Sequence, residues 1–292
     1  MIGRFLGAAI LALLLAACGQ PEHASQRAGT PALWEIEGVG GAPAGWLFGT
    51  VHALPDGTKW ENSALDGAVR GAGLLVVEVK DLKDQAAIAE VFQDMAYDKP
   101  PAPLVWRVPP SARDALDRAV SASGATRPDL ARMETWAVAL VLARSAAPLD
   151  PQNGVDRELE MRFAKRPVVE LEGASRQLAV FDRLAEEDQR AMLLSVLKEA
   201  GTAGRQSDAL VAAWLEGDLA AIERTALQGM LSDPELYDAL LAGRNRRWAD
   251  QLQDFIDRCR RPLVAVGAAH MVGKDGLPAL LAAKGYTVRR VQ

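Results

Sequence analysis

Two apolar stretches, one near each end of the chain, run directly into the same four-residue pattern. Residues 46–51 lead into Gly49-Thr50-Val51-His52, and residues 263–267 lead into Gly267-Ala268-Ala269-His270. Both stretches are rich in β-branched and large apolar side chains, which is typical of buried strands. The sequence therefore places a glycine and a histidine at the point where each of two buried strands ends.

Each of these strands opens the same succession of elements. A helix is expected over residues 61–70 and a second strand over 74–79, and a helix over about 277–284 precedes a strand over 286–291. We interpret the two strand-helix-strand units as an internal repeat that carries one Gly-x-x-His motif in each copy. The expected fold class is α/β, with α+β character, in which the two units flank a large insertion.

The insertion, about residues 81–258, is predicted to be mostly helical. Apolar residues spaced by three and four predict a helix over about 129–146, and Asp233-Pro234 marks the start of a helix that continues toward Arg258. A short strand is expected over residues 168–171. If this strand continues, the carboxylates of Glu170 and Glu172 point to one face, where one of them serves as a general base or an additional ligand.

Histidine is scarce in this chain, which draws attention to His52 and His270. The chain has three histidines, and His23 precedes the folded body. A glycine three residues before each of the other two lets the backbone turn sharply, and imidazole serves near neutral pH as a metal ligand or a base. Ligands usually bind at the strand ends of an open α/β sheet, so we expect the two side chains to share one site.

Glu78 is a carboxylate inside the otherwise apolar strand 74–79. An unpaired buried charge is costly, so this side chain is expected to have a partner. Two imidazoles and one carboxylate form a donor set suited to a divalent transition metal, which points to His52, Glu78 and His270 as ligands. The alternative is that Glu78 pairs with a structural arginine.

Three other polar residues are interpreted from their local sequence. Asp156 lies at the expected start of a helix, where capping is the simplest role. Arg244 and Asn245 open an arginine-rich run, a pattern that is typical of a solvated charged face.

The N-terminus is predicted to be an export signal. One charge, Arg4, precedes an apolar run that ends in Leu15-Ala16-Ala17-Cys18 and is too short to span a bilayer. Residues 1–17 are therefore expected to be a lipoprotein signal peptide, with Cys18 as the lipidated residue. Residues 18–32 are predicted to form a flexible tether, and residues 33–292 the folded domain. Because Gly19 rather than Asp follows Cys18, we expect a lipid anchor in the outer membrane of a Gram-negative host, on its periplasmic side.

Charge and hydropathy exclude two classes of function. The net charge is −5, and the chain has no basic stripe of the kind that nucleic-acid binding requires. No apolar run after the N-terminal segment is long enough to span a membrane. With Cys18 lipidated, Cys259 has no cysteine to pair with, so no intramolecular disulfide is expected.

Taken together, these motifs resemble the TraB/GumN family, whose relatives include the Tiki metalloproteases. The similarity follows family order through Leu33–Gly38, Leu47–His52, Val76–Glu78, Gly154–Asp156, Glu170–Glu172, Gln177-Leu178, Arg244-Asn245, Ala265–Gly273, Gly276-Leu277 and Gly285-Tyr286.

This resemblance implies a metal-dependent hydrolase of the peptidase kind, which uses a manganese, cobalt-like or zinc ion and acts on a peptide or small-molecule substrate. It implies His52, Glu78 and His270 as metal ligands, with Arg244 and Asn245 as further members of the site. We expect Arg244 to stabilise an oxyanion or grip a substrate carboxylate, while Glu170 or Glu172 moves the proton.

A more distant similarity, to erythromycin-esterase and ChaN-like proteins, leaves two alternatives open. One is a metal-free hydrolase in which His52 is the base. The other is a haem- or iron-binding lipoprotein without catalysis, in which the histidines ligate iron.

Overall fold

A mixed sheet of six strands lies at the centre of the computed structural model, which describes residues 29–99, 101–146, 149 and 151–292. The strands are β1 (Leu33–Glu37), β2 (Pro43–Thr50), β3 (Leu74–Val77), β4 (Val168–Glu170), β5 (Pro262–Gly267) and β6 (Thr287–Arg290). Their order across the sheet is β4-β3-β5-β2-β1-β6. Strands β4, β3, β5 and β2 are parallel, whereas β1 pairs antiparallel with β2 and β6. The mixed α/β class expected from the sequence is confirmed.

The register of the parallel strands brings the two Gly-x-x-His motifs together. Thr50 at the end of β2 lies opposite Gly267 at the end of β5. On the other side of β5, Val77 at the end of β3 lies opposite Ala265. Because parallel strands end at the same edge of a sheet, the residues that follow β2, β3 and β5 emerge side by side.

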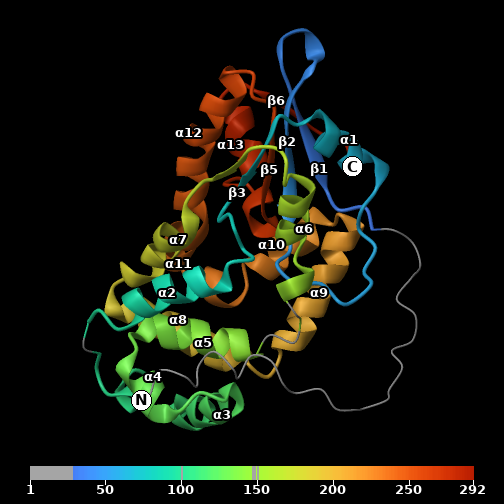
Figure 1. Cartoon of the computed structure of the whole chain (residues 1–292). Helices are drawn as coiled ribbons and strands as arrows, with labels where there is room; N and C mark the ends of the chain where they lie inside the picture. Colours follow the sequence, from blue (N-terminus) through green and yellow to red (C-terminus); the bar gives the residue numbers. More distant parts are fainter. Residues whose placement is uncertain (1–28, 100, 147–148, 150) are drawn as a thin grey trace.

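Helices cover both faces of the sheet, so the architecture has three layers (Figure 1). One face is covered by α1 (Ser63–Gly71), α6 (Val155–Arg162), α9 (Ala203–Glu216) and α10 (Leu219–Ala226), and the other by α12 (Gly243–Asp257) and α13 (Leu277–Ala283). Side chains alternate along β2, where Phe48 packs with Trp214 in one layer and Leu47 packs with Trp248 in the other.

The remaining helices lie beneath the carboxyl ends of the parallel strands (Figure 1). They are α2 (Gln85–Ala96), α3 (Arg113–Ser123), α4 (Arg127–Arg132), α5 (Thr135–Ala146), α7 (Gly173–Asp182), α8 (Glu186–Glu199) and α11 (Pro234–Tyr237). A separate apolar cluster around the fully buried Trp136 holds most of them together. Residues 81–258 are therefore mostly helical, as expected. The helices around Trp136 lie next to the edge of the sheet where the parallel strands end.

Two helices that the periodicity predicts as continuous are interrupted. The helix expected over about 129–146 breaks at Met133, whose backbone is extended, and Glu134 donates its N–H to the carbonyl of Ala96. The helix expected from Asp233 toward Arg258 contains a π-helical turn over Asp238–Ala242. Apolar spacing detects the buried face of each segment, but it does not detect these local changes of backbone.

The two strand-helix-strand units have the predicted order of elements but different places in the sheet. Strands β2 and β3 of the first unit flank β5, whereas β6 of the second unit lies at the sheet edge beyond β1. The structure therefore does not confirm an internal repeat. The strand β1 was not expected from the periodicity, and it separates β2 from β6.

The predictions for the N-terminus fall outside the described residues. The signal peptide 1–17, Cys18 and the tether as far as residue 28 belong to this part of the chain. Within the described residues, no helix has both the length and the apolar character needed to cross a membrane. Cys259 is exposed and carries no disulfide.

Candidate functional site

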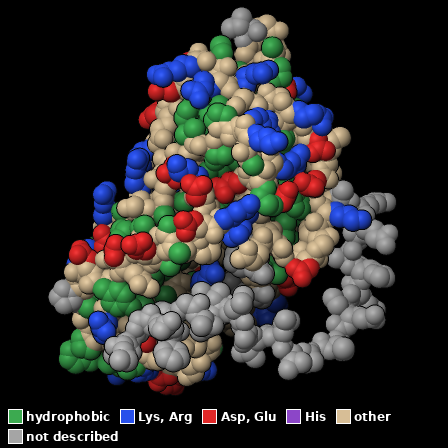
Figure 2. Space-filling view, in the orientation of Figure 1, with side chains coloured by type: hydrophobic (Ala, Val, Ile, Leu, Met, Phe, Trp, Pro, Cys, Tyr) green, Lys and Arg blue, Asp and Glu red, His purple; other side chains and the backbone are tan. Residues whose placement is uncertain are grey.

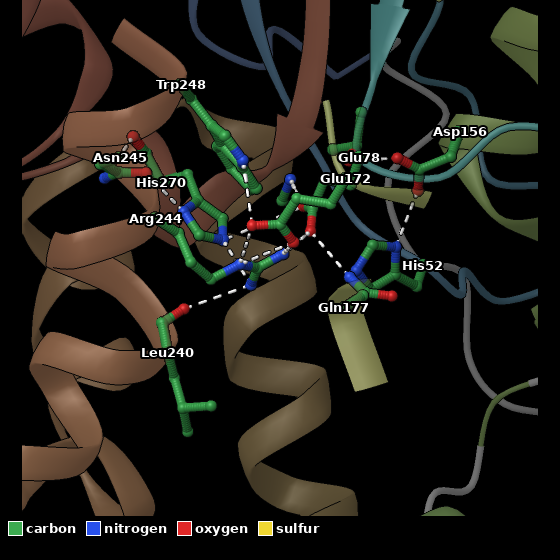
Figure 3. A network of polar contacts seen from close by, with 12 residues as sticks. His52, Glu78, Asp156, Glu172, Gln177, Leu240, Arg244, Asn245, Trp248 and His270 are labelled. Atoms are coloured by element: carbon green, nitrogen blue, oxygen red, sulfur yellow. Dashed lines mark hydrogen bonds and ion pairs between the residues drawn. The ribbon is translucent and has the colours of Figure 1, made fainter. Parts of the chain in front are cut away.

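The residues that follow β2, β3 and β5 form one polar cluster at the carboxyl edge of the sheet. His52 follows β2, Glu78 follows β3 directly, and His270 lies in a 3-10 turn, Ala268–Met271, directly after β5. Figure 3 shows the two histidines on either side of the carboxylates of Glu78 and Glu172. The structure therefore brings together the three residues that the sequence proposes as metal ligands.

His52 is oriented by Asp156, a residue that lies 104 positions later in the chain. Nδ1 of His52 lies 2.9 Å from a carboxylate oxygen of Asp156, whose other oxygen accepts a hydrogen bond of 2.7 Å from the hydroxyl of Thr50. Asp156 is buried in the first turn of α6, whereas 68% of the His52 side chain is exposed. The negative charge of Asp156 raises the pKa of His52 to about 9.

His270 is oriented by Asn245 on α12. The side-chain amide of Asn245 donates to the carbonyls of His270 and Asp275, so its oxygen is the acceptor that faces Nδ1 of His270 at 2.6 Å. An acceptor in this place fixes the tautomer, with the proton on Nδ1 and a lone pair on Nε2. Burial and the positive charge of Arg244 lower the pKa of His270 to about 4, although Glu78 opposes them, so the ring is neutral. The indole of Trp248 packs on this ring, with the ring centres 4.5 Å apart.

Glu78 is buried and fully engaged. One oxygen accepts the backbone N–H of Gly267 at 2.8 Å, and the other accepts Arg244 at 2.7 Å and Gln177 at 3.0 Å. Burial by itself raises the pKa of Glu78. His270, which becomes protonated below its own pKa of about 4, and Arg244 reverse this effect and lower the pKa of Glu78 to about 2. Glu78 is therefore an anion at neutral pH, and the predicted alternative of a pairing with arginine describes its contact correctly.

Arg244 connects Glu78 to a second buried carboxylate, Glu172. Its guanidinium donates to both oxygens of Glu172 at 2.9 to 3.2 Å and to the carbonyl of Leu240. Glu172 also accepts the indole N–H of Trp248 at 3.1 Å. With 9% of its side chain exposed, Arg244 is a buried cation held between two anions.

Gly267 lies where the three predicted ligands meet. A methyl group added to Gly267 would come within 3.3 Å of Glu78 Oε1, 3.7 Å of His270 Cδ2 and 3.8 Å of His52 Nε2. In addition, His270 Nε2 lies 3.9 Å from the same Glu78 oxygen. His52 Nε2, one oxygen of Glu78 and the edge of the His270 ring therefore border the small space that this glycine leaves open.

Three interpretations from the sequence need correction. Arg244 and Asn245 do not form a solvated face, because both are buried against the sheet. The spacing of Arg244 indicates its burial, because it precedes the buried Trp248 and Leu252 by one and two turns on the same face of α12. Asp156, interpreted as a helix cap, instead binds the side chains of Thr50 and His52.

The third correction concerns Glu170 and Glu172. Strand β4 ends at Glu170, so the expected alternation does not continue and the two carboxylates do not share a face. Glu170 accepts the backbone N–H of Lys80, whereas Glu172 pairs with Arg244. Because Glu172 is held by Arg244 and Trp248, it is a structural anion of the cluster rather than a free base.

The cluster carries excess negative charge but does not form a preassembled metal site. The three anions Glu78, Glu172 and Asp156 outnumber the two cations, Arg244 and the protonated His52. Within the described part of the chain, however, no three His, Cys, Asp or Glu side chains are arranged to hold a metal ion. Arg244 explains this spacing, because it lies against Glu78 and 3.4 Å from His270 Nε2.

Comparison with known proteins identifies the family. The chain is 34% identical over 152 residues to the uncharacterized protein YbaP of Escherichia coli (strain K12) and to that of Shigella flexneri. Each match covers 50% of this chain and 55% of the relative, so it spans about half the length of these curated relatives. No solved structure shows a significant match. A match to the TraB/PrgY/gumN family extends over residues 32–290, almost the whole described body, and the chain therefore belongs to this family.

Proposed function

We propose that this protein is a metal-dependent hydrolase that cleaves a peptide or a related carbonyl compound. One observation carries the proposal: His52 and His270 are each held through Nδ1 by an oxygen acceptor, and both rings border the space beside Glu78, with His270 Nε2 3.9 Å from a Glu78 oxygen. Histidines that bind metals are characteristically oriented by such a second hydrogen bond. The resemblance to the Tiki metalloproteases, which is inferred from the sequence motifs, supports the same proposal.

The chemical types of the donor atoms suit a divalent transition metal. Imidazole nitrogen and carboxylate oxygen suit manganese, cobalt or zinc, and two positive charges would balance the excess of negative charge in the cluster. The same excess holds a proton on His52, whose pKa is about 9. Because the donors are not preassembled, they would have to draw together when a cation binds, and the exposed His52 has the freedom to do so.

The neighbouring residues have separate roles in this proposal. His52, Glu78 and His270 would hold the cation, which supplies Lewis acidity when it is bound. Asp156 and Asn245 orient the two imidazoles. Arg244 fixes Glu78 and adds a positive charge beside the reacting group, but as a cation it is not a ligand.

A cavity of about 260 Å³ next to His52 is the proposed place for the substrate. Its wall includes the apolar side chains of Val79, Leu82 and Ile88 together with Arg144. Arg144 is exposed and has no side-chain partner among the described residues. This combination fits a substrate with an apolar group next to the reacting carbonyl and a carboxylate that reaches Arg144.

A metal-free hydrolase is the second candidate, and the contact of Arg244 with Glu78 and His270 favours it. In that case the pair of His52 and Asp156 performs the acid-base chemistry. Because Asp156 raises the pKa of His52 to about 9, the ring is protonated at neutral pH and acts as a base only after losing that proton. Activity of this kind rises as the pH approaches 9.

Metal binding and cleavage, measured on the same purified protein, test the proposal. After removal of metals with a chelator, calorimetric titration with Mn²⁺, Co²⁺ and Zn²⁺ should show one site, and cleavage of a peptide library should require the ion. Replacement of His52, Glu78 or His270 by alanine should abolish both. Glu170→Gln is the matched control, because this carboxylate lies nearby but outside the cluster, and it should keep both.

Either of two results would overturn the proposal in favour of an alternative. Cleavage that survives complete chelation and rises toward pH 9 would establish the metal-free candidate. A Soret band on titration with haem, without cleavage of any peptide, would establish the haem- or iron-binding alternative.

We also propose that Cys18 carries a lipid that anchors the protein on the periplasmic side of the envelope, in the outer membrane. Support comes from the sequence: an apolar run followed by Leu15-Ala16-Ala17-Cys18, with Gly19 next. The membrane would then be a partner only through this lipid.

A further inference from the structure

A second cavity, of about 490 Å³, lies between α7 and α12 and shares no lining residue with the cavity at His52. Arg176 from α7, Arg183 directly after α7 and Arg247 from α12 line it. Figure 2 shows Lys and Arg side chains along the left edge of the molecule, over α12. The cavity therefore places three guanidinium groups around one hollow.

These arginines are not neutralised by the protein. The side chains of Arg176 and Arg183 are exposed and have no hydrogen bond or ion pair in the part of the chain that the structure describes. Arg247 is 59% exposed and lies 4.0 Å from Glu172. Glu172 is the one carboxylate in the lining, and it is already bound to Arg244 and to the indole of Trp248. The cavity is therefore positive, although the whole chain is acidic.

Guanidinium groups recognise oxyanions, because their planar fork of N–H donors matches two oxygens of a phosphate or carboxylate. The rest of the lining includes the apolar side chains of Leu171, Ala179 and Val180. A volume of about 490 Å³ exceeds the needs of one small ion and leaves room for an organic body. We propose that this cavity binds an organic oxyanion that carries at least two negative charges.

This ligand is separate from the substrate of the His52 site. Glu172 forms part of the wall of the arginine cavity, and Glu78 forms part of the wall of the other. Between them lies Arg244, bound to both carboxylates, and all three side chains are at most 9% exposed. A buried ion-pair cluster thus separates the two cavities, and one ligand does not bridge them.

Calorimetric titration of the full chain with pyrophosphate and with citrate tests the proposal, and acetate serves as the singly charged comparison. We expect at least one of the two multivalent anions to bind at one site, with acetate at least tenfold weaker. A site that binds pyrophosphate but not citrate is specific for phosphate groups. A site that binds both anions recognises their negative charge. The variant Arg176→Gln/Arg183→Gln should bind at least tenfold more weakly than the wild type.

The matched control is Arg118→Gln/Arg205→Gln, which removes the same charge from exposed arginines on α3 and α9 that have no side-chain partner among the described residues. This variant should bind as the wild type does. Equal weakening in both double variants would show general attraction of anions and overturn the proposal, as would no binding of either anion at millimolar concentration. Since His52→Ala should leave the affinity unchanged, the result does not depend on the proposed hydrolase function.

Discussion

Replacement of Arg244 by methionine should destabilise the metal-free protein by an amount that the structure allows us to work out. The guanidinium is the only cation that contacts Glu78 and Glu172 at hydrogen-bonding distance among the described residues, and all three side chains are buried. Arg244→Met keeps an unbranched apolar stem but removes the guanidinium, which leaves two buried carboxylates without this partner. Removal of one member of a buried ion pair typically costs about 3 to 5 kcal/mol.

The pKa of Glu78 supports the direction of this effect. Although burial raises it, His270 and Arg244 lower it from 4.5 to about 2. Arg244 contributes to this lowering after His270, so its loss removes part of the stabilisation of the Glu78 anion. For a domain of this size, a loss of about 3 to 5 kcal/mol corresponds to a fall of roughly 6 to 20 °C in Tm.

The sign of the pH dependence follows from the same contacts. A lowered pKa contributes stability that is present above the unfolded value near 4.5 and is lost as the pH falls through about 2. In Arg244→Met, burial acts on Glu78 without this cation, so its pKa rises and mild acid protonates the unpaired carboxylate. The difference in stability between the wild type and the variant should therefore narrow between pH 7 and pH 4.

Urea denaturation followed by circular dichroism, with a chelator present, measures both effects. The matched control is Arg246→Met, two residues along the same helix, where the lost ion pair with Asp238 is exposed to water and screened. A loss in Arg244→Met no larger than in this control, or a difference that widens in acid, would refute the reasoning.

Three further outcomes are expected. Asp156→Asn should lower the pKa of His52 from about 9 toward 6.5 in an NMR titration, and an unchanged pKa would mean that Asp156 is not the cause. Because a raised pKa stabilises most below about pH 6.5 and the effect is lost as the pH rises through 9, this variant should differ least from the wild type in alkali. Gly267→Ala should weaken metal binding roughly tenfold or more, because the added methyl crowds Glu78, and wild-type affinity would contradict this. Cys18→Ser should abolish acyl labelling while the circular dichroism spectrum of the body stays unchanged, and labelling that persists would exclude the lipid anchor.

Local sequence was enough to predict the strand ends that build the site. Continuous apolar runs are characteristic of buried strands, and glycine before each histidine marks where these strands turn. The sequence alone therefore indicates the polar residues that follow β2, β3 and β5 as candidates. Their meeting at one edge follows from the parallel direction of the strands, which the strand-helix-strand pattern predicts.

The partners of these residues were decided only by the tertiary structure. Glu78 and Arg244 are 166 positions apart, and His52 and Asp156 are 104 apart. Local propensity describes how a residue suits a helix end or a helix surface, and it correctly placed Asp156 and Arg244 on helices. Which side chain each one contacts depends on how α6 and α12 dock on the sheet. Because a buried charge must find its counter-charge wherever packing brings one, the ion-pair cluster exists only in the assembled fold.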